Sequence, residues 1–384
     1  MNILFVTPSY KPAFVYGGPT VSVSELAEAL VAIGHSVTVY TTTANGTEEL
    51  DVALNKPILL NGVSVYYFRR ITGDHTHVSP DLWLKLWGTK KRFEIIHLQS
   101  WWSLLIVGAA LVCSLGKQPY IISPRGMLGA YSFRNQHSFF KKLLHLVIGK
   151  RLLKKSILHA TTELEWNDCT RVNNKWTGFI EHNLVQLPDI NRLQKQQTGN
   201  SVFTIGFLSR IDPKKGIELL LQALALVPFQ FKLKMAGTGD EAYIVSLKNL
   251  VNELNLAQHV EWCGWKGGEE KFHFLQSLDL FALTSYNENF AIAVTEALAV
   301  GTPVLVSNMV GLAPFVQERK LGFICRTTVQ SIRKELINIY QNKEILGTIR
   351  NAAPATVTED FNKEKLAEKY IEAYKRHTST SIGN

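Results

Sequence analysis

The feature that most constrains the fold is an alternation of strand-like and helix-like segments that runs along the chain twice. The apolar strand segments of the first half occupy residues 2–8, 36–43, 94–100 and 119–126, and a clear helical pattern covers 17–35. The strand segments of the second half occupy residues 202–210, 231–237, 260–264 and 278–285. Because parallel strands need helical crossovers, this order predicts an α/β fold whose parallel sheets carry helices on both faces.

A break between the two runs predicts two domains. Residues 186–201 are polar, contain Pro188 and show no hydrophobic period, which is typical of a linker. We therefore expect an N-terminal domain at 1–187, a linker at 188–200 and a C-terminal domain at 201–361. The amphipathic helix at 362–378 is expected to pack back onto the first domain. Residues 44–93 follow neither pattern clearly and are expected to be looser.

Two glutamates suggest where a ligand binds. Glu288 lies in the loop before a predicted helix, and Glu296 is expected about two turns into that helix, on roughly the same side. Hydroxyls of a sugar diphosphate can bind such carboxylates, and its phosphates can bind the positive end of the helix. The alternative is that one glutamate caps the helix while the other is a solvated surface residue.

Glycines and cations follow the other predicted strands. Gly17 and Gly18 come after the first strand, where adjacent glycines let the backbone approach an anion. Their spacing is not GxGxxG, which disfavours a nicotinamide site. Arg210 and Lys215, in SRIDPKKG, suit a diphosphate whose charge rises as it leaves, or form a solvated basic pair.

Two further turns of the second domain are candidates for nucleotide contacts. Gly237 and Gly239 end one strand in MAGTGD, where the backbone can approach a ribose or a base. Trp265 ends the next strand, and its ring either contacts a base or packs internally. Four scattered cysteines form no CxxC or Cys/His cluster, which favours a reducing compartment and disfavours a zinc site.

The net charge of +9 has a local source. Basic residues gather between Arg134 and Lys155 without an acid, and apolar residues recur at near-helical spacing in 139–155. Such a helix can lie on an anionic membrane surface, steer an anionic acceptor, or simply present a solvated basic face. No nucleic-acid-binding motif accompanies the charge. Residues 95–116 lack charged side chains, but polar interruptions favour a strand and a buried helix over a membrane span.

The order of the motifs resembles a known enzyme family. The GG turn, SRIDPKKG, AGTGD, CGW and ENFAIAVTEALAVGTPV together look like a retaining glycosyltransferase of family GT4. The resemblance implies a GT-B fold, with two Rossmann-like domains facing each other across a cleft. It covers nearly the whole chain and is densest from 203 to 307. The stretch ISPRGMLGAYSF is similar to members that build bacterial cell-surface polysaccharides.

The resemblance also implies roles for individual residues. Arg210 and Lys215 would hold the donor diphosphate, Glu288 the sugar hydroxyls and Glu296 the ribose. Backbone N–H groups of Asn289, Phe290 and Ala291 would meet the sugar or phosphate, while Gly17 and Gly18 would pack against the donor phosphate and the acceptor.

The chain departs from the family pattern in two places that concern the site. Ala291 stands where many members have glycine. Arg125 stands near where many have a histidine, and it is expected to bind a phosphate or an acidic sugar. Asn183, in EHNLVQLP, is not assigned a role because the family's PNG-type segment is altered there.

The resulting expectation is a hexosyltransferase that uses a nucleotide diphosphate sugar and needs no cofactor. No Asp-x-Asp occurs, so a metal held in that common way is not expected, and Arg210 and Lys215 would take its place. The expected location is the cytoplasm or the inner face of the plasma membrane. Alternatives are a nucleotide-sugar epimerase of related fold, and a membrane-surface scaffold without enzymatic activity.

Overall fold

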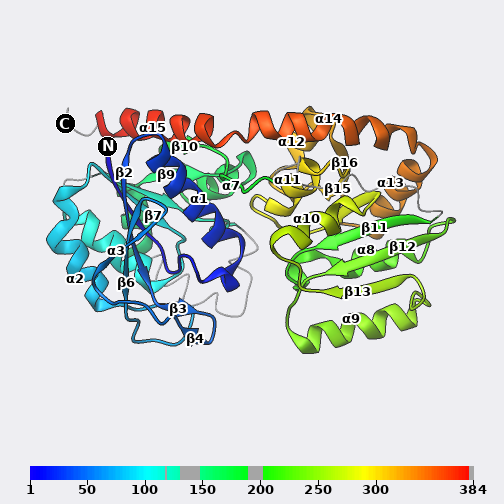
Figure 1. Cartoon of the computed structure of the whole chain (residues 1–384), viewed down its shortest axis with the longest axis horizontal. Coiled ribbons are helices and arrows are strands. Elements are labelled where there is room, and N and C mark those ends of the chain that lie inside the picture. The colour runs from blue at the N-terminus through cyan, green and yellow to red at the C-terminus, as the bar shows by residue number, and fades with distance from the viewer. Residues whose placement is uncertain (117–118, 130–147, 189–201, 380–384) are drawn as a thin grey trace. The chain divides into compact units, whose positions relative to one another are not determined.

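The computed structural model describes residues 1–116, 119–129, 148–188 and 202–379 (Figure 1). Unit 1 comprises Met1–Val185 together with Phe361–Asn384, and unit 2 comprises Gln186–Asp360. The expected linker at 188–200 lies, apart from Pro188, outside the described residues, and so does the part of the basic helix that precedes 148.

The sheet of unit 1 has the strand order β10-β9-β8-β7-β1-β2-β6-β5. Every neighbouring pair is parallel except the edge strand β5, which runs antiparallel to β6. The strands are β1 Asn2–Val6, β2 Ser36–Thr42, β5 Pro57–Leu60, β6 Val63–Phe68, β7 Ile95–Gln99, β8 Tyr120–Ser123, β9 Ile157–Ala160 and β10 Gly178–Ile180. A separate small hairpin pairs β3 Ala44–Asn45 with β4 Glu48–Glu49.

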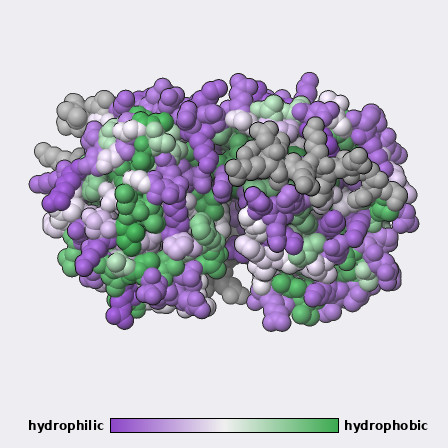
Figure 2. All heavy atoms as spheres, viewed as in Figure 1, coloured by the Kyte–Doolittle hydropathy of each residue, from purple (hydrophilic) through white to green (hydrophobic). Residues whose placement is uncertain are grey.

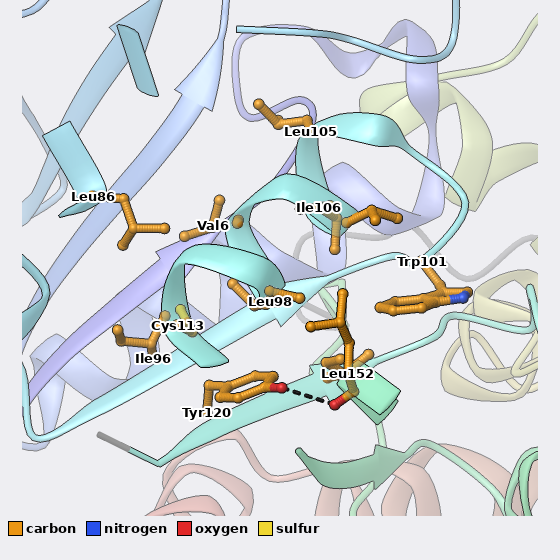
Figure 3. Close-up of a cluster of buried hydrophobic side chains, with 14 of the residues drawn as sticks. Val6, Leu86, Ile96, Leu98, Trp101, Leu105, Ile106, Cys113, Tyr120 and Leu152 are labelled. Atoms are coloured by element: carbon orange, nitrogen blue, oxygen red, sulfur yellow. Dashed lines mark hydrogen bonds between the residues drawn. The ribbon is translucent and has the colours of Figure 1, made fainter. Parts of the chain in front are cut away.

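Helices and short 3-10 turns connect these strands. Those that the structure describes in unit 1 are η1 Phe14–Tyr16, α1 Gly18–Ala32, α2 Pro80–Thr89, η2 Lys90–Arg92, α3 Leu104–Ser114, α6 Lys150–Lys155, α7 Glu163–Val172 and α15 Lys363–Ser379. Figure 3 shows side chains of α2, α3 and α6 meeting those of β7 in one buried cluster. The Tyr120 hydroxyl donates to the Leu152 carbonyl at 2.8 Å, which ties α6 to the sheet.

The expectation of a loose stretch at 44–93 was wrong. The stretch contains β5, β6 and α2, and it completes one edge of the sheet. The strand β6 alternates between buried and less buried residues because one of its faces is only partly covered. By contrast, the prediction for 95–116 is confirmed, since β7 is fully buried and α3 follows it. Within the described ranges, no helix has the length and apolar character needed to cross a bilayer.

A chain of hydrogen bonds joins α15 to the sheet of unit 1. His97 Nδ1 lies 2.8 Å from the Tyr374 hydroxyl, and its Nε2 lies 2.5 Å from the Ser123 hydroxyl. Ser123 in turn contacts His159, whose Nε2 lies 2.9 Å from the Tyr370 hydroxyl. Figure 1 shows α15 beside α1, and the two helices are joined by the ion pair between Lys363 and Glu25. The C-terminal helix therefore belongs to unit 1 through both polar and packing contacts.

The sheet of unit 2 is entirely parallel in its described part, with the order β13-β12-β11-β14-β15-β16. Its strands are β11 Phe203–Leu208, β12 Phe231–Ala236, β13 Val260–Gly264, β14 Leu280–Leu283, β15 Val304–Ser307 and β16 Gly322–Cys325. Its helices are η4 Pro213–Lys215, α8 Ile217–Leu224, α9 Glu241–Glu253, α10 Gly268–Gln276, α11 Ile292–Ala299, α12 Ala313–Glu318, α13 Val329–Gln341 and α14 Glu344–Asp360. The prediction of parallel α/β sheets in both halves is confirmed.

The strand order of each sheet reverses direction at one point. In unit 2 the chain moves outward from β11 through β12 in one direction and from β14 through β15 in the other. In unit 1 the corresponding reversal lies between β1 and β7. Ligands of open parallel sheets bind outside the carboxyl ends of the strands at such reversals. Ligands are therefore expected at the loops that follow β11 and β14 in unit 2, and at those that follow β1, β7 and β8 in unit 1.

Candidate functional site

The turn after β11 packs closely against the segment after β14. Asp212 caps η4 by accepting a hydrogen bond from the Lys214 N–H at 3.0 Å. Gly216 follows with φ 62°, and a Cβ there would lie 2.5 Å from the Thr284 carbonyl oxygen. The Thr284 hydroxyl donates to the Gly216 carbonyl at 2.9 Å. Only glycine allows this close approach, which brings the SRIDPKKG turn to the reversal point of the sheet.

Lys215 and Glu288 meet at this point. Their side chains form an ion pair, and Lys215 is 9% exposed as a residue. The backbone of Glu288 is fixed as well, because its N–H donates to the Met309 carbonyl at 3.0 Å and its carbonyl accepts from the Gly311 N–H at 2.8 Å. The structure thus holds an ammonium and a carboxylate in defined positions, although they are 73 residues apart in sequence.

Arg210 lies in the same turn but is held less firmly. Its side chain is 73% exposed, and its Nε lies 3.6 Å from an Asp212 carboxylate oxygen. A further cation there, Lys214, was not among the residues singled out from the sequence. Burial lowers the pKa of Lys214, and the nearby Glu288 carboxylate opposes that shift. The turn therefore gathers three basic residues, of which Arg210 remains at the surface.

The N-terminus of α11 adds positive potential beside Glu288. Ala291 is the N-cap residue, with φ 71° in the left-handed region, and no side chain caps this described helix. The Ala291 carbonyl accepts from the Val294 N–H at 2.9 Å. Asn289 and Phe290 precede it, and the Phe290 ring is buried. The first N–H groups of a helix attract anions, so the turn suits a phosphate or a sugar oxygen.

Glu296 lies one turn into α11 rather than two, because the helix begins only at Ile292. It is buried, and its Oε1 lies 2.5 Å from the Nζ of Lys271 on α10. Burial raises the pKa of the Glu296 carboxyl, and Lys271 opposes that shift. The two glutamates thus have separate lysine partners, and Glu296 is not a solvated surface residue.

Gly237 and Gly239 are required by the protein's own backbone. A Cβ on Gly237 would lie 1.9 Å from the Ser209 carbonyl oxygen, and one on Gly239 would lie 1.9 Å from that of Ile211. The Ile211 N–H donates to the Thr238 carbonyl at 2.8 Å, which joins the turn after β12 to the turn after β11. These glycines therefore position the Arg210 and Lys215 turn.

Trp265 does not pack internally. Its side chain is among the exposed large apolar groups, at 69% exposure. Its ring lies over Gly267, where a Cβ would come within 2.0 Å of it. The ring packs on Gly267 with one face and offers a flat apolar surface on the other. The interpretation of Trp265 as a core residue is therefore wrong.

In unit 1, Gly17 and Gly18 connect η1 to α1. Gly17 has φ 67° and ψ −135°, a conformation that side-chain-bearing residues rarely adopt. A Cβ there would meet nothing within 4 Å, so the space above the start of α1 is open. Gly18 is the first residue of α1 rather than part of the turn.

Arg125 follows β8 and is held by two amide oxygens. Its Nε and Nη2 donate to Gln99 Oε1 at 3.0 and 2.8 Å, and its Nη1 donates to Asn183 Oδ1. Asn183, left without a role in the sequence analysis, is thus a direct partner of Arg125.

Comparison with known proteins identifies the family. The family described as "Glycosyl transferases group 1" matches residues 190–356, and "Glycosyltransferase Family 4" matches residues 16–161. The chain is a family 4 glycosyltransferase. Its relatives include an uncharacterized glycosyltransferase of Methanocaldococcus jannaschii, 27% identical over 98% of both chains. Another, N-acetyl-alpha-D-glucosaminyl L-malate synthase of Bacillus anthracis, is 23% identical over 51% of this chain and 52% of its own length.

Solved structures confirm the GT-B fold of this hexosyltransferase. Sucrose-phosphate synthase from Thermosynechococcus elongatus superposes with a TM-score of 0.76 at 19% identity, covering 99% of this chain and all of that one. Anabaena HepE, in complex with UDP-glucose, gives a TM-score of 0.74 at 20% identity, with 97% and 98% of the two chains covered. The expectation of a GT4 enzyme with two Rossmann-like sheets is therefore confirmed.

Sequence reasoning missed several residues of this glycosyltransferase's candidate site. Lys271 binds Glu296 from another helix, while Gln99 and Asn183 bind Arg125 from other strands' ends. The position of Gln99 at the carboxyl end of a buried strand was a usable signal, because polar residues there lie at the ligand-binding edge of the sheet. In the described part of the chain, no three His, Cys, Asp or Glu side chains gather as a metal site would need.

Proposed function

We propose that this glycosyltransferase moves a hexosyl group from a nucleoside diphosphate sugar to a hydroxyl of a glycan or lipid-linked glycan, with retention at the anomeric carbon. The observation that carries the proposal is the buried ion pair of Lys215 with Glu288 beside the N-terminus of α11. It combines a cation for phosphate, a carboxylate for sugar hydroxyls and a helix end for anionic oxygens.

The donor diphosphate is assigned to the turn after β11. Lys215 pairs with Glu288 at the reversal point. The side chain of Arg210 is 73% exposed, and the contact that holds it among the described residues is the one of 3.6 Å with Asp212, so it can turn toward a bound phosphate. Two cations stabilise the charge that grows on the leaving diphosphate. In this proposal they take the place of a metal ion, and catalysis proceeds in the presence of a chelator.

The chemistry then needs little acid–base assistance from the protein. The bond between the anomeric carbon and the donor phosphate oxygen breaks, and the acceptor oxygen forms the new bond on the same face. The acceptor proton passes to the departing phosphate oxygen, so atoms and charges balance. The enzyme contributes alignment and stabilisation of the diphosphate.

The remaining donor contacts are assigned by position. Glu288 accepts hydrogen bonds from hydroxyls of the donor sugar, while backbone N–H groups around Ala291 face the sugar or the phosphate. Glu296 accepts a hydrogen bond from a ribose hydroxyl. Its carboxylate then binds both Lys271 and the ligand. The exposed ring of Trp265 stacks on or edges against the base.

Gly17 and Gly18 face the donor phosphate and the acceptor in this proposal. The open space above Gly17 and the start of α1 supports that assignment, since a backbone without Cβ permits close approach. Gly237 and Gly239 contribute by holding the turn after β11 in place.

The names of relatives favour cell-surface polysaccharide synthesis as the setting. One is the lipopolysaccharide core biosynthesis glycosyltransferase LpsE of Rhizobium meliloti, 23% identical over 56% of this chain and 61% of its own. We propose an acceptor of that kind, and a location in the cytoplasm at the inner face of the membrane.

A basic surface on unit 1 supports contact with that membrane. Lys150, Arg151, Lys154 and Lys155 of α6 are exposed, whereas Leu152 and Leu153 are buried. Lys155 Nζ lies 3.4 Å from the Ser114 carbonyl at the end of α3, next to the 65% exposed Leu115. Figure 2 shows apolar side chains among hydrophilic ones on the same unit. Cations beside exposed apolar groups suit an anionic bilayer surface.

The test is a panel of UDP-, GDP- and ADP-sugars, measured by thermal shift and by nucleotide release in EDTA with lipid-linked sugar acceptors. Stabilisation by one nucleotide and acceptor-dependent release are expected. Isomerisation of the donor sugar without acceptor would indicate an epimerase instead. Stabilisation by no nucleotide at all would contradict the proposal.

A further inference from the structure

Arg125 is a partly buried cation that no carboxylate neutralises directly. Its guanidinium donates three hydrogen bonds to the neutral amide oxygens of Gln99 and Asn183. Across the described ranges, no carboxylate oxygen lies within ion-pair distance of it. Burial lowers the pKa of the Arg125 guanidinium, as expected for a cation removed from water without a counter-charge.

The acidic group that acts on Arg125 from nearby is already engaged. Glu165 Oε1 accepts the Gly126 N–H at 2.6 Å, and Oε2 accepts the backbone N–H and the hydroxyl of Thr161 at 2.8 and 2.9 Å. Glu165 therefore fixes the loops after β8 and β9. The positive charge of Arg125 is left available for an anion from outside the chain.

An unpaired donor lies beside the guanidinium. Gln99 is 1% exposed, its Oε1 is fixed by Arg125, and its Nε2 has no hydrogen-bond partner among the residues that the structure describes. Because the oxygen of this amide is committed to Arg125, the amide cannot turn over to satisfy the nitrogen. A buried donor left unpaired costs about 1–3 kcal/mol, so an acceptor atom at this position would stabilise the site.

Other features of the same loops agree with a binding site. The indole Nε1 of Trp101 is also buried and has no partner within the described part of the chain, and Figure 3 shows it turned away from the aliphatic cluster. Ser100 and Arg125 both have positive φ, 79° and 57°, which is uncommon for residues with side chains. The unsatisfied groups after β7 and β8 are thus donors and a cation, at the edge of the sheet where ligands bind.

We propose that Arg125 and Gln99 form a subsite for an oxyanion of the acceptor, so that the acceptor is an acidic or phosphorylated sugar. The inference rests on the proposed function, because it assigns the acceptor to unit 1 and the donor to unit 2. A purely structural Arg125 would account for its bonds to Gln99 and Asn183. It would leave the unpaired amide nitrogen and the missing counter-charge unexplained.

The experiment compares three probes that differ only at carbon 6: methyl β-glucoside, methyl β-glucuronide and methyl β-glucoside 6-phosphate. Binding to the full chain is measured by calorimetry in 0.15 M salt, with UDP, GDP and ADP titrated in parallel. We expect at least tenfold tighter binding of one or both anionic probes. The carboxylate and phosphate arms identify which oxyanion the site takes.

Variants separate the subsite from the general positive charge of the protein. Arg125→Gln and Gln99→Leu are expected to reduce the preference to less than threefold. Arg92→Gln is the matched control, since it also removes one arginine charge from unit 1, at an exposed position. It should keep the preference.

The outcomes are distinct from those that test the proposed function. Equal binding of all three probes by the unaltered chain, with at least one of the nucleotides bound, overturns the subsite and leaves glycosyl transfer standing. Loss of the preference in Arg92→Gln as well overturns it too. Absence of binding of UDP, GDP and ADP alike contradicts the proposed function instead. The comparison within the unaltered chain holds even if Arg125→Gln fails to fold.

Discussion

Lys215 and Glu288 differ in their surroundings from another lysine–glutamate pair of unit 2. Lys232 and Glu261 lie at 2.5 Å, but their side chains are about half exposed, at 48% and 45%. Such surface pairs contribute about 0–1 kcal/mol to stability. The side chains of Lys215 and Glu288 are only 11% and 18% exposed, so their desolvation offsets much of their attraction. Stability alone is therefore a weak reason for this buried pair, which agrees with a role in binding.

Ala291 is a residue in a conformation that suits glycine. Its φ of 71° places Cβ close to the backbone, which costs about 1–2 kcal/mol. Ala291→Gly should relieve this strain while adding unfolded-state entropy worth about 0.4–1 kcal/mol. We expect the free energy of unfolding of unit 2, measured in urea, to rise by about 0.5–1 kcal/mol.

The control for that change is Ala293→Gly, two residues further along in α11. Its backbone is helical, so the same substitution should destabilise the protein by about 1 kcal/mol. Equal destabilisation by both substitutions would show that Ala291 is not strained.

At the scale of elements, the turn after β12 holds the turn after β11. Gly239→Ala would place a methyl group 1.9 Å from the Ile211 carbonyl oxygen, so one turn must move. We expect the unfolding free energy to fall by about 2 kcal/mol or more, and donor affinity to fall with it. Gly347→Ala in α14 meets nothing within 4 Å and should instead stabilise the helix by about 1 kcal/mol. Unchanged donor affinity in a folded Gly239→Ala protein would show that the turn after β12 does not position the turn after β11.

The helix α6 carries the membrane prediction. Replacing Lys150, Arg151, Lys154 and Lys155 by glutamine removes four exposed cations that each contribute about 1 kcal/mol near an anionic bilayer. We expect binding to phosphatidylglycerol-containing vesicles to weaken at least tenfold in flotation assays. The matched control replaces four exposed cations of unit 2, namely Lys248, Lys320, Arg326 and Lys334. Equal loss in both variants would attribute binding to net charge alone.

At the scale of the whole molecule, the hydrogen-bonded link between α15 and the sheet predicts acid sensitivity. Burial lowers the pKa of His159 to about 3 and that of His97 well below its usual range. Both histidines are neutral in the folded protein, whereas the unfolded chain binds protons near pH 6.5. Their stabilising contribution is therefore present above about pH 6.5 and is lost as pH falls toward their folded pKa values.

Below pH 6.5, each histidine should remove up to about 1.4 kcal/mol of stability per pH unit. Urea unfolding at pH 7.5, 6.5 and 5.5 measures this slope. A His159→Gln variant should show a shallower slope. The same stability at pH 7.5 and 5.5 would show that these histidines are protonated in the folded protein.

The sequence was sufficient for the α/β architecture because buried parallel strands and amphipathic helices have distinct hydrophobic periods. It did not reveal β5, which begins with Pro57 and is half-exposed at the sheet edge. The alternation in β6 was a usable signal that was missed. Likewise, Lys215 and Glu288 were found from motifs, but the pairings of Glu296 with Lys271 and of Arg125 with Asn183 were not. These partners are 25 and 58 residues apart, and only the folded chain brings them together.

The most direct test of the account is transfer by Lys215→Ala compared with Lys232→Ala, in EDTA and at saturating donor. The donor is the sugar nucleotide that stabilises the unaltered enzyme. Removing the buried cation from the leaving diphosphate should raise the barrier by about 3 kcal/mol, which is roughly a hundredfold loss of turnover. Lys232→Ala, at the opposite end of β12 from the site, should transfer at the unaltered rate. Unaltered turnover in a folded Lys215→Ala protein would contradict the assignment of the site.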